Sequence, residues 1–536
     1  MFGKLKKRLR FEYGKTPNAM YFDGDMNWIN AHYEFRKGQG LDEFLVDDIT
    51  WHDLSMDDLF KQINTRLTTS GEQYLYYLLR SPTLKEDEYD RRYELIEFVE
   101  TNPDLRLKLQ VAFAKLGRRR GVQLHQLFTT ADSRYEKIFL YAFLALALVG
   151  TFVGGTLLGN PFLALMFISL LIFNSLYHHF TFKKIEHQLQ TVSYIMAMVG
   201  TAKKVKKLDI SELSAHLEGF YKSVERLKHI QKTAFTIQDN KGAKDEISLV
   251  LTFMLNNFFL LDLFAFELVR NKLGKYHQDI FNIHETIGAL DASISIASYR
   301  QSLGEYTVPT IDFSDNAEIS LQLTDVVHPL VKNPIVNSLD TDTPILLTGS
   351  NASGKSTFLR SVTLNMIMAQ SICTVVARSY EAPAFYIYSS MAIADNLLAG
   401  DSYFIAEIKS MKRIVDAINT KHPVFCVIDE ILRGTNTVER ISASSELLKL
   451  MAKKGALCLS ATHDIELCEL LKGDYEMFHF TEQITATGDV VFDYQLRKGR
   501  AMTRNAIKLL DTLGFDDELV KSANERAILY EQNGKW

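Results

Sequence analysis

The chain has 536 residues, of which 47% are apolar and 23% are charged, and its formal net charge at pH 7 is −5. The apolar content is ordinary for a folded protein and excludes disorder for most of the chain. The acidic balance argues against a protein that coats DNA, so contact with nucleic acid requires a local basic patch. None of the four cysteines lies in a CxxC pair, which argues against a disulfide framework or a zinc site and suits a reducing cytosol.

The N-terminal part of the chain is predicted to be mainly helical. Proline is absent from residues 162–308, where leucine, lysine, glutamate and glutamine recur with helical spacing. We therefore expect extended helical structure over residues 42–134 and 183–304. A short apolar run in the second stretch, residues 247–261, is interrupted by two asparagines. We interpret it as a core helix, with membrane contact as the alternative.

An uncharged segment separates the two helical stretches. Residues 138–182 contain no Asp, Glu, Lys or Arg, and these 45 residues are enough for two membrane spans of about 20 residues each. Gly159-Asn160-Pro161, near the middle, predicts a turn. Basic residues flank both ends, as expected for a hairpin that enters and leaves from the cytosol. The alternative is a buried hairpin in a soluble core, but a soluble helix pair normally has a polar face.

The pattern changes after Pro309, where short apolar runs begin to alternate with helical segments. Residues 344–348, 424–428 and 456–460 are such runs, and each ends in a polar turn. This alternation predicts a parallel α/β sheet with its reactive residues at the carboxyl ends of the strands.

Residues 349–356 match the pattern GxxxxGK[ST] between an apolar strand and a predicted helix. In that context, backbone N–H groups and the helix N-terminus cradle the phosphates of a nucleotide. Lys355 is expected to reach the β- and γ-phosphates, and the Ser356 hydroxyl to bind Mg²⁺. The residues expected to bind ATP are Gly349, Ser350, Asn351, Ala352, Ser353, Gly354, Lys355, Ser356 and Thr357.

Two further groups follow apolar strands. Asp429 and Glu430 come after five apolar residues, so Asp429 is expected to support Mg²⁺ and Glu430 to activate water. His463 follows the next strand and is expected to contact the γ-phosphate or the attacking water. The alternatives are a surface carboxylate pair and a structural histidine.

Together these elements resemble the MutS family of DNA mismatch-repair ATPases. The matching landmarks are His328-Pro329, residues 401–408 (DSYFIAEI), residues 429–437 (DEILRGTNT) and residues 461–463 (ATH). The resemblance covers residues 321–530. It extends to residues 41–135 and 183–308, because residues 51–82 are similar to the start of the family's helical core.

The resemblance implies a homodimer with composite ATP sites. Ser402 would reach the γ-phosphate of the partner chain, and residues 506–523 would form a helical dimerisation element. ATP binding would then close the dimer and move the long helices. The chain departs from the family pattern at Leu432 and Ser353, which replace glycines, and at Tyr403, which replaces threonine. These changes leave the chemical groups in place.

A larger departure is expected at the N-terminus. Family members that find mismatches carry an N-terminal domain with a Phe-x-Glu wedge. Only about 40 residues precede the helical core here, and Phe11-Glu12 is not that motif because its residues are adjacent. The chain therefore resembles a membrane-anchored MutS-like protein without the mismatch-recognition domain.

The expected fold is multidomain, α and α/β, with a helical core and lever interrupted by a transmembrane hairpin and followed by a P-loop, ABC-like ATPase domain. The ATPase domain would face the cytosol at the cytoplasmic membrane. The expected parts are an N-terminal extension (1–40), helical core (41–135), hairpin (136–182), helical lever (183–308), ATPase domain (309–505) and dimerisation element (506–536).

Two functions fit the sequence. The first is a Mg²⁺-dependent ATPase that binds DNA and acts in mismatch repair or in the repair of other DNA structures. The basic clusters at residues 4–10 and 118–120 support this function. Those clusters also suit membrane anchoring. The alternative is a membrane-tethered mechanochemical ATPase whose partner is a protein or lipid assembly. A transporter is disfavoured, because two spans without charge line no substantial path.

Overall fold

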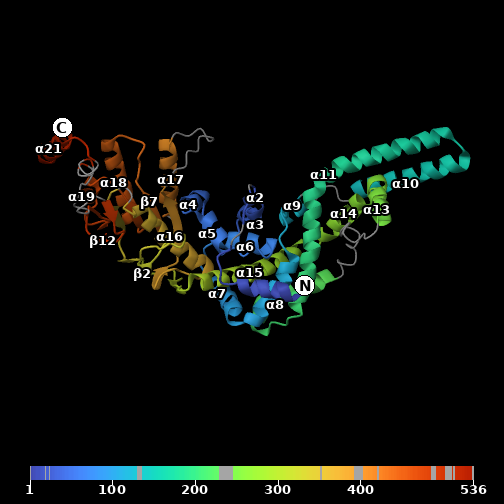
Figure 1. Cartoon of the computed structure of the whole chain (residues 1–536), viewed down its shortest axis with the longest axis horizontal. Coiled ribbons are helices and arrows are strands. Elements are labelled where there is room, and N and C mark those ends of the chain that lie inside the picture. The colour runs from blue at the N-terminus through green and yellow to red at the C-terminus, as the bar shows by residue number, and fades with distance from the viewer. Residues whose placement is uncertain are drawn as a thin grey trace. The chain divides into compact units, whose positions relative to one another are not determined.

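The computed structural model describes residues 2–17, 20–22, 24–129, 136–228, 246–350, 353–391, 403–418, 422–484, 490–500, 507, 510 and 514–533. The chain divides into two compact units, and Figure 1 shows their elements. The first unit consists of residues 1–42, 62–78 and 91–302. The second consists of residues 43–61, 79–90 and 303–536.

The described part of the first unit is built from helices, as the sequence predicts. A large apolar core joins several of its long helices and includes the fully buried Phe113, Tyr194, Phe220 and Phe266. Its helices are α1 (Phe2–Glu12), α2 (Met26–Ile29), α3 (Ala31–Gln39), α6 (Thr69–Arg80), α7 (Glu86–Thr101), α8 (Pro103–Leu116), α9 (Leu124–Thr129), α10 (Glu136–Leu158), α11 (Pro161–Lys206), α12 (Ser214–Arg226), α13 (Glu246–Phe259), α14 (Leu261–Gly274) and α15 (His277–Leu303), of which parts of α6 and α7 and the last residue of α15 belong to the second unit.

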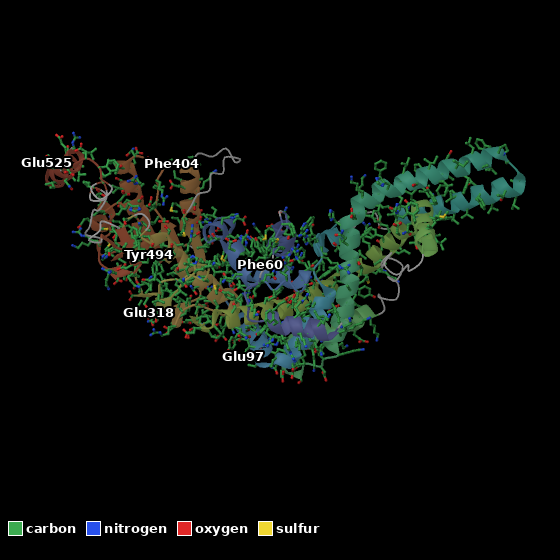
Figure 2. The ribbon with its side chains drawn as sticks, in the orientation of Figure 1. Phe60, Glu97, Glu318, Phe404, Tyr494 and Glu525 are labelled. Atoms are coloured by element: carbon green, nitrogen blue, oxygen red, sulfur yellow. The ribbon has the colours of Figure 1, made fainter. Side chains whose placement is uncertain are left out.

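The uncharged segment forms a helical hairpin, in which α10 lies along the first part of α11 (Figure 1). The turn falls where the sequence predicts it, and the Asn160 side chain accepts a hydrogen bond from the Phe162 N–H at 3.0 Å. Apolar side chains on both helices point outward, with Leu157 80% and Phe162 69% exposed (Figure 2). Within the described residues, two helices are long and apolar enough to cross a membrane, residues 137–158 and the apolar part of α11, and the bent pair of residues 250–259 and 261–274 would be a third candidate if it formed one span.

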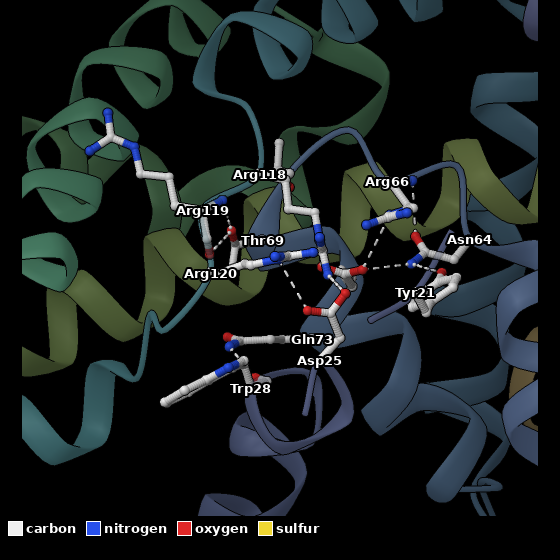
Figure 3. Close-up of polar contacts among 12 residues, drawn as sticks. Tyr21, Asp25, Trp28, Asn64, Arg66, Thr69, Gln73, Arg118, Arg119 and Arg120 are labelled. Atoms are coloured by element: carbon white, nitrogen blue, oxygen red, sulfur yellow. Dashed lines mark hydrogen bonds and ion pairs between the residues drawn. The ribbon is translucent and has the colours of Figure 1, made fainter. Parts of the chain in front are cut away.

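The basic cluster at residues 118–120 is engaged inside the first unit (Figure 3). Arg118 Nε lies 2.6 Å from Glu72 Oε2, and its Nη2 lies 3.1 Å from Asp25 Oδ2. Arg120 Nε is 3.1 Å from the other oxygen of Asp25. Arg119 donates to Ser193 Oγ at 2.6 Å. These guanidinium groups hold helices together, so the cluster is a weaker candidate for a DNA-binding patch than the sequence suggests.

The second unit is α/β. Its main sheet has six strands in the order β12-β9-β4-β8-β7-β6, parallel except for β12, and a four-stranded sheet has the order β1-β5-β2-β3. The strands are β1 (Thr310–Asp312), β2 (Leu321–Val326), β3 (Asn337–Thr341), β4 (Ile345–Thr348), β5 (Ser379–Pro383), β6 (Tyr386–Ser390), β7 (Val424–Asp429), β8 (Leu457–Ala461), β9 (Glu476–His479), β10 (Glu482–Ile484), β11 (Val490–Phe492) and β12 (Arg497–Lys498). The helices are α4 (Asp48–Asp53), α5 (Met56–Ile63), α16 (Lys355–Ile372), α17 (Tyr403–Ala417), α18 (Thr437–Lys453), α19 (Glu466–Leu470) and α21 (Asp517–Asn533).

Candidate nucleotide site

Three neighbouring strands end together at one edge of the six-stranded sheet. Leu347 of β4 pairs with Ala461 of β8, and Asp429 of β7 pairs with the same Ala461. Because parallel strands carry their carboxyl ends to the same edge, the loops that follow β4, β7 and β8 meet there. The sheet register therefore brings together the three groups that the sequence marks as reactive.

The loop after β4 requires glycine at its first position. Gly349 has a φ of 141°, and a Cβ atom added to it would lie 2.7 Å from the Phe480 carbonyl oxygen. The loop ends at the N-terminus of α16, an 18-residue helix whose first N–H groups have no partner within the helix. Ser353 Oγ in this loop is buried without a hydrogen-bond partner. The backbone N–H groups of such a loop and of the helix N-terminus can donate hydrogen bonds to an anion.

Lys355 turns its ammonium group into this loop. Its Nζ donates to the carbonyl oxygens of Gly349 at 2.8 Å and Ser350 at 2.9 Å, and lies 3.3 Å from His463 Nε2. The side chain is only 5% exposed. Burial lowers the pKa of Lys355, whereas the carboxylates of Asp429 and Glu430 raise it. A buried cation held by neutral carbonyl groups is suited to bind a phosphate.

Ser356 and Asp429 form a pair of oxygen ligands. Ser356 Oγ, on the first turn of α16, donates to Asp429 Oδ2 at 2.5 Å. Hydroxyl and carboxylate oxygens are the donors that Mg²⁺ prefers, and Mg²⁺ commonly takes one or two carboxylates together with phosphate oxygens. The residues therefore fit a Mg²⁺–nucleotide complex.

Glu430 lies beside this pair at the end of β7. Its Oε1 is 3.0 Å from His463 Nε2, and its Oε2 is 2.7 Å from Arg433 Nε. The hydrogen bond from His463 lowers the pKa of the Glu430 carboxyl, and the charges of Arg433 and Lys355 lower it further. The backbone of Glu430 is left-handed, with a φ of 58°, and its N–H donates to the Ala461 carbonyl at 2.9 Å. This carboxylate stays ionised near neutral pH and can accept a proton from water.

Glu407 of α17 holds the loop that follows Glu430. Its two carboxylate oxygens accept hydrogen bonds from the N–H groups of Arg433 at 3.1 Å and Gly434 at 3.2 Å. Gly434 packs closely, since an added Cβ would lie 3.0 Å from the Cβ of Phe404, which Figure 2 labels. Glu407 falls within residues 401–408, one of the landmarks of the family resemblance, but the sequence alone assigns it no role.

A cleft of about 1170 Å³ opens at these loops. It is lined by Lys355, Ser356, Asp429, Glu430 and His463. Four aromatic or imidazole side chains that the sequence motifs do not assign to the nucleotide site also line it, and these are His328, Phe480, Phe492 and Tyr494. Its volume is large enough for a nucleotide.

Contacts beyond the sequence motifs also shape the site. Ser350 Oγ donates to Glu482 Oε2 at 2.7 Å, although the two residues are far apart in the sequence. Leu432, which stands where the resembled family has glycine, has a φ of 55°. A left-handed conformation costs a non-glycine residue roughly 1–2 kcal/mol. Three expected residues, Asn351, Ala352 and Ser402, lie outside the described part of the chain.

Comparisons with known proteins agree with these motifs. Residues 345–531 match the model of MutS domain V. The DNA mismatch repair protein MutS of Thermotoga maritima is 30% identical over 275 residues, which are 50% of this chain and 34% of that protein. MutS of Bacillus velezensis is 27% identical over 341 residues, 61% of this chain and 38% of that protein. The chain thus spans about a third of the length of these relatives.

Proposed function

Because the chain belongs to the MutS family, we propose that it is a Mg²⁺-dependent ATPase that couples ATP hydrolysis to dimer closure on DNA. The observation that carries this proposal is the meeting of the Lys355 ammonium, the Ser356–Asp429 pair and the Glu430–His463 pair at one sheet edge. These groups are a cation for phosphate, oxygen ligands for a hard metal and a base for water. The relatives named above are mismatch-repair proteins, which favours DNA as the partner.

In this mechanism each side chain has one task. Lys355 would bind the β- and γ-phosphates, and Ser356 and Asp429 would hold Mg²⁺, which would neutralise charge on the phosphates. Glu430 orients a water molecule and accepts its proton. His463 donates to Glu430 and fixes the direction of its carboxylate. Glu407 keeps the 433–434 backbone in place.

We further propose that the hairpin of α10 and α11 anchors the protein in the cytoplasmic membrane, with the nucleotide site in the cytosol. The support is the charge-free run of residues 138–182 and its outward apolar side chains. The positive charges on both flanks favour entry and exit on the cytosolic side. Two chains would complete each ATP site, with Ser402 supplied by the partner.

The test is ATP turnover by the detergent-solubilised protein without DNA and with homoduplex, mismatched and branched DNA. Glu430→Gln serves as the blank. We expect at least one DNA form to change the rate and to bind with an affinity that falls steeply with salt. Turnover that is indifferent to every DNA, without binding at low salt, would contradict the DNA role and favour a protein or lipid partner.

A further inference from the structure

Helix α13 carries an apolar face that the described part of the protein does not cover. Val250 is 59%, Leu251 56% and Phe253 62% exposed. The sequence favoured a core helix here, but these side chains are open. The helix packs against both α10 and α11, so its exposed face adjoins the outward apolar surface of the hairpin. Figure 1 shows α13 beside these two helices.

Two polar side chains of α11 fix the end of α13. Asn174 Nδ2 donates to the Phe258 carbonyl oxygen at 2.8 Å, and Asn174 is fully buried. One turn further along, His178 Nε2 lies 2.8 Å from Asp262 Oδ2. Residues at i and i+4 lie on one face of a helix, so both hydrogen bonds come from the same side of α11. Thus the polar groups on this face of α11 form hydrogen bonds with residues at the junction between α13 and α14.

The chain bends by 70° at this junction, and Leu260 there has a φ of 56°. A bend frees backbone carbonyl groups, and a free carbonyl in hydrocarbon costs several kcal/mol. The hydrogen bond from Asn174 to Phe258 removes one such cost.

The junction lies within the apolar zone of the hairpin. Asn174 is nine residues before Lys183, the first charged residue on α11, which is a rise of about 13 Å. On the other side, Leu260 packs with Tyr141 and Leu144 of α10. The adjoining chain is charged at both ends, with Asp245 and Glu246 before the apolar run and Asp262 after it. Helix α13 has 14 residues and is about 21 Å long, too short to cross a hydrocarbon core of about 30 Å.

We propose that residues 247–261 form a re-entrant element, which enters the cytosolic leaflet of the membrane as α13, bends at Leu260 and returns as α14. This inference rests on the proposed membrane hairpin. The occupant of the open face is lipid, because the face is continuous with the hairpin surface and residues 247–261 carry no charge. The hydrogen bonds of Asn174 and His178 lock the element to α11.

The proposal is tested by labelling single cysteines with a polar maleimide in purified protein reconstituted in liposomes, with the reagent on both sides. The four native cysteines are buried, which keeps the background low. The probes are Val250→Cys and Phe253→Cys. Leu146→Cys, at a 70% exposed position of α10, is the hairpin reference, and Lys222→Cys on α12 is the water-exposed reference.

We expect both α13 cysteines to react at least tenfold more slowly than Cys at position 222, and to become reactive in detergent. If they react as fast as position 222 while position 146 stays protected, the re-entrant element is wrong and the hairpin stands. If position 146 is also reactive, the membrane hairpin itself fails. Protection in native membranes that is lost in liposomes would assign the face to a protein partner and overturn the lipid proposal.

Discussion

Glu430 and His463 face each other across the ends of β7 and β8, with 3.0 Å between Glu430 Oε1 and His463 Nε2. The other oxygen of the carboxylate is held by Arg433 Nε at 2.7 Å. Both oxygens of Glu430 therefore contact cationic or hydrogen-bonding groups, which lowers its pKa and its strength as a base. To accept a proton from water, the carboxylate must exchange one of these two contacts for the water molecule.

The first prediction concerns this carboxylate. Glu430→Gln should retain ATP binding and slow hydrolysis by about 10²–10⁴-fold, because the amide cannot accept the proton of water. Single-turnover hydrolysis and nucleotide binding are measured on the same preparation. Glu446→Gln, on the exposed face of α18, is the matched control and should leave both unchanged. Normal hydrolysis by Glu430→Gln would mean that another group is the base.

The second prediction separates binding from chemistry. Lys355→Ala should weaken ATP binding by at least tenfold, because it removes the buried ammonium group that faces the loop carbonyls. Titration with a fluorescent ATP analogue measures the dissociation constant. Lys449→Ala, which removes an exposed ammonium on α18, should bind as the parent protein does. Equal affinities for the two variants would argue against Lys355 as a phosphate ligand.

The third prediction concerns Glu407, which positions the loop and does not touch the reacting groups. Glu407→Gln keeps one acceptor oxygen and loses the charge that serves the N–H groups of Arg433 and Gly434. A charge-assisted hydrogen bond is worth about 1.5–3 kcal/mol, so kcat should fall by about 10–100-fold. The KM for ATP should change little, since the phosphate loop is untouched. A change confined to KM would show that Glu407 acts on binding.

The local parts of the site could be predicted from the sequence because they are contiguous. An apolar strand, a glycine-rich loop and a helix beginning at Lys355 follow one another within residues 345–372, and the structure has β4, the loop and α16 there. The turn at Gly159-Asn160-Pro161 also lies between α10 and α11, as predicted. In these two segments the tertiary contacts agree with the local backbone preferences.

The long-range parts could not be predicted in this way. Ser350 and Glu482 are 132 residues apart, and Glu407 is 27 residues from Gly434, so no periodicity links the partners. The same limit applies to α11, which continues from the apolar segment to Lys206 as one helix of 46 residues. Hydropathy changes at Lys183, where the expected boundary between hairpin and lever lies, but the helix continues across it.

The fourth prediction is a pH dependence of stability. Burial lowers the pKa of His328 to about 4, below the value of about 6.5 expected in an unfolded chain. Between these values the unfolded state binds more protons, so stability falls as pH decreases, by about 2 kcal/mol from pH 6.5 to 5. His328→Asn keeps an acceptor for the Leu330 N–H and does not titrate. Denaturation at pH 7.5 and 5 should show a smaller loss for this variant, whereas identical losses would contradict the assignment.

The fifth prediction tests the membrane hairpin without disturbing its packing. Leu144 is nearly buried against Leu260 and Leu263, whereas Leu146 is 70% exposed on α10. Leu146→Arg therefore places a charge toward lipid at a cost of about 3 kcal/mol and should lower the amount of protein that resists carbonate extraction from membranes. Leu470→Arg, at an exposed position on α19, should behave as the parent protein does. If Leu146→Arg is extracted no more readily than this control, Leu146 does not face hydrocarbon. Release of the parent protein from membranes by high salt alone would contradict the membrane anchor, because extraction of a hairpin embedded in lipid requires detergent.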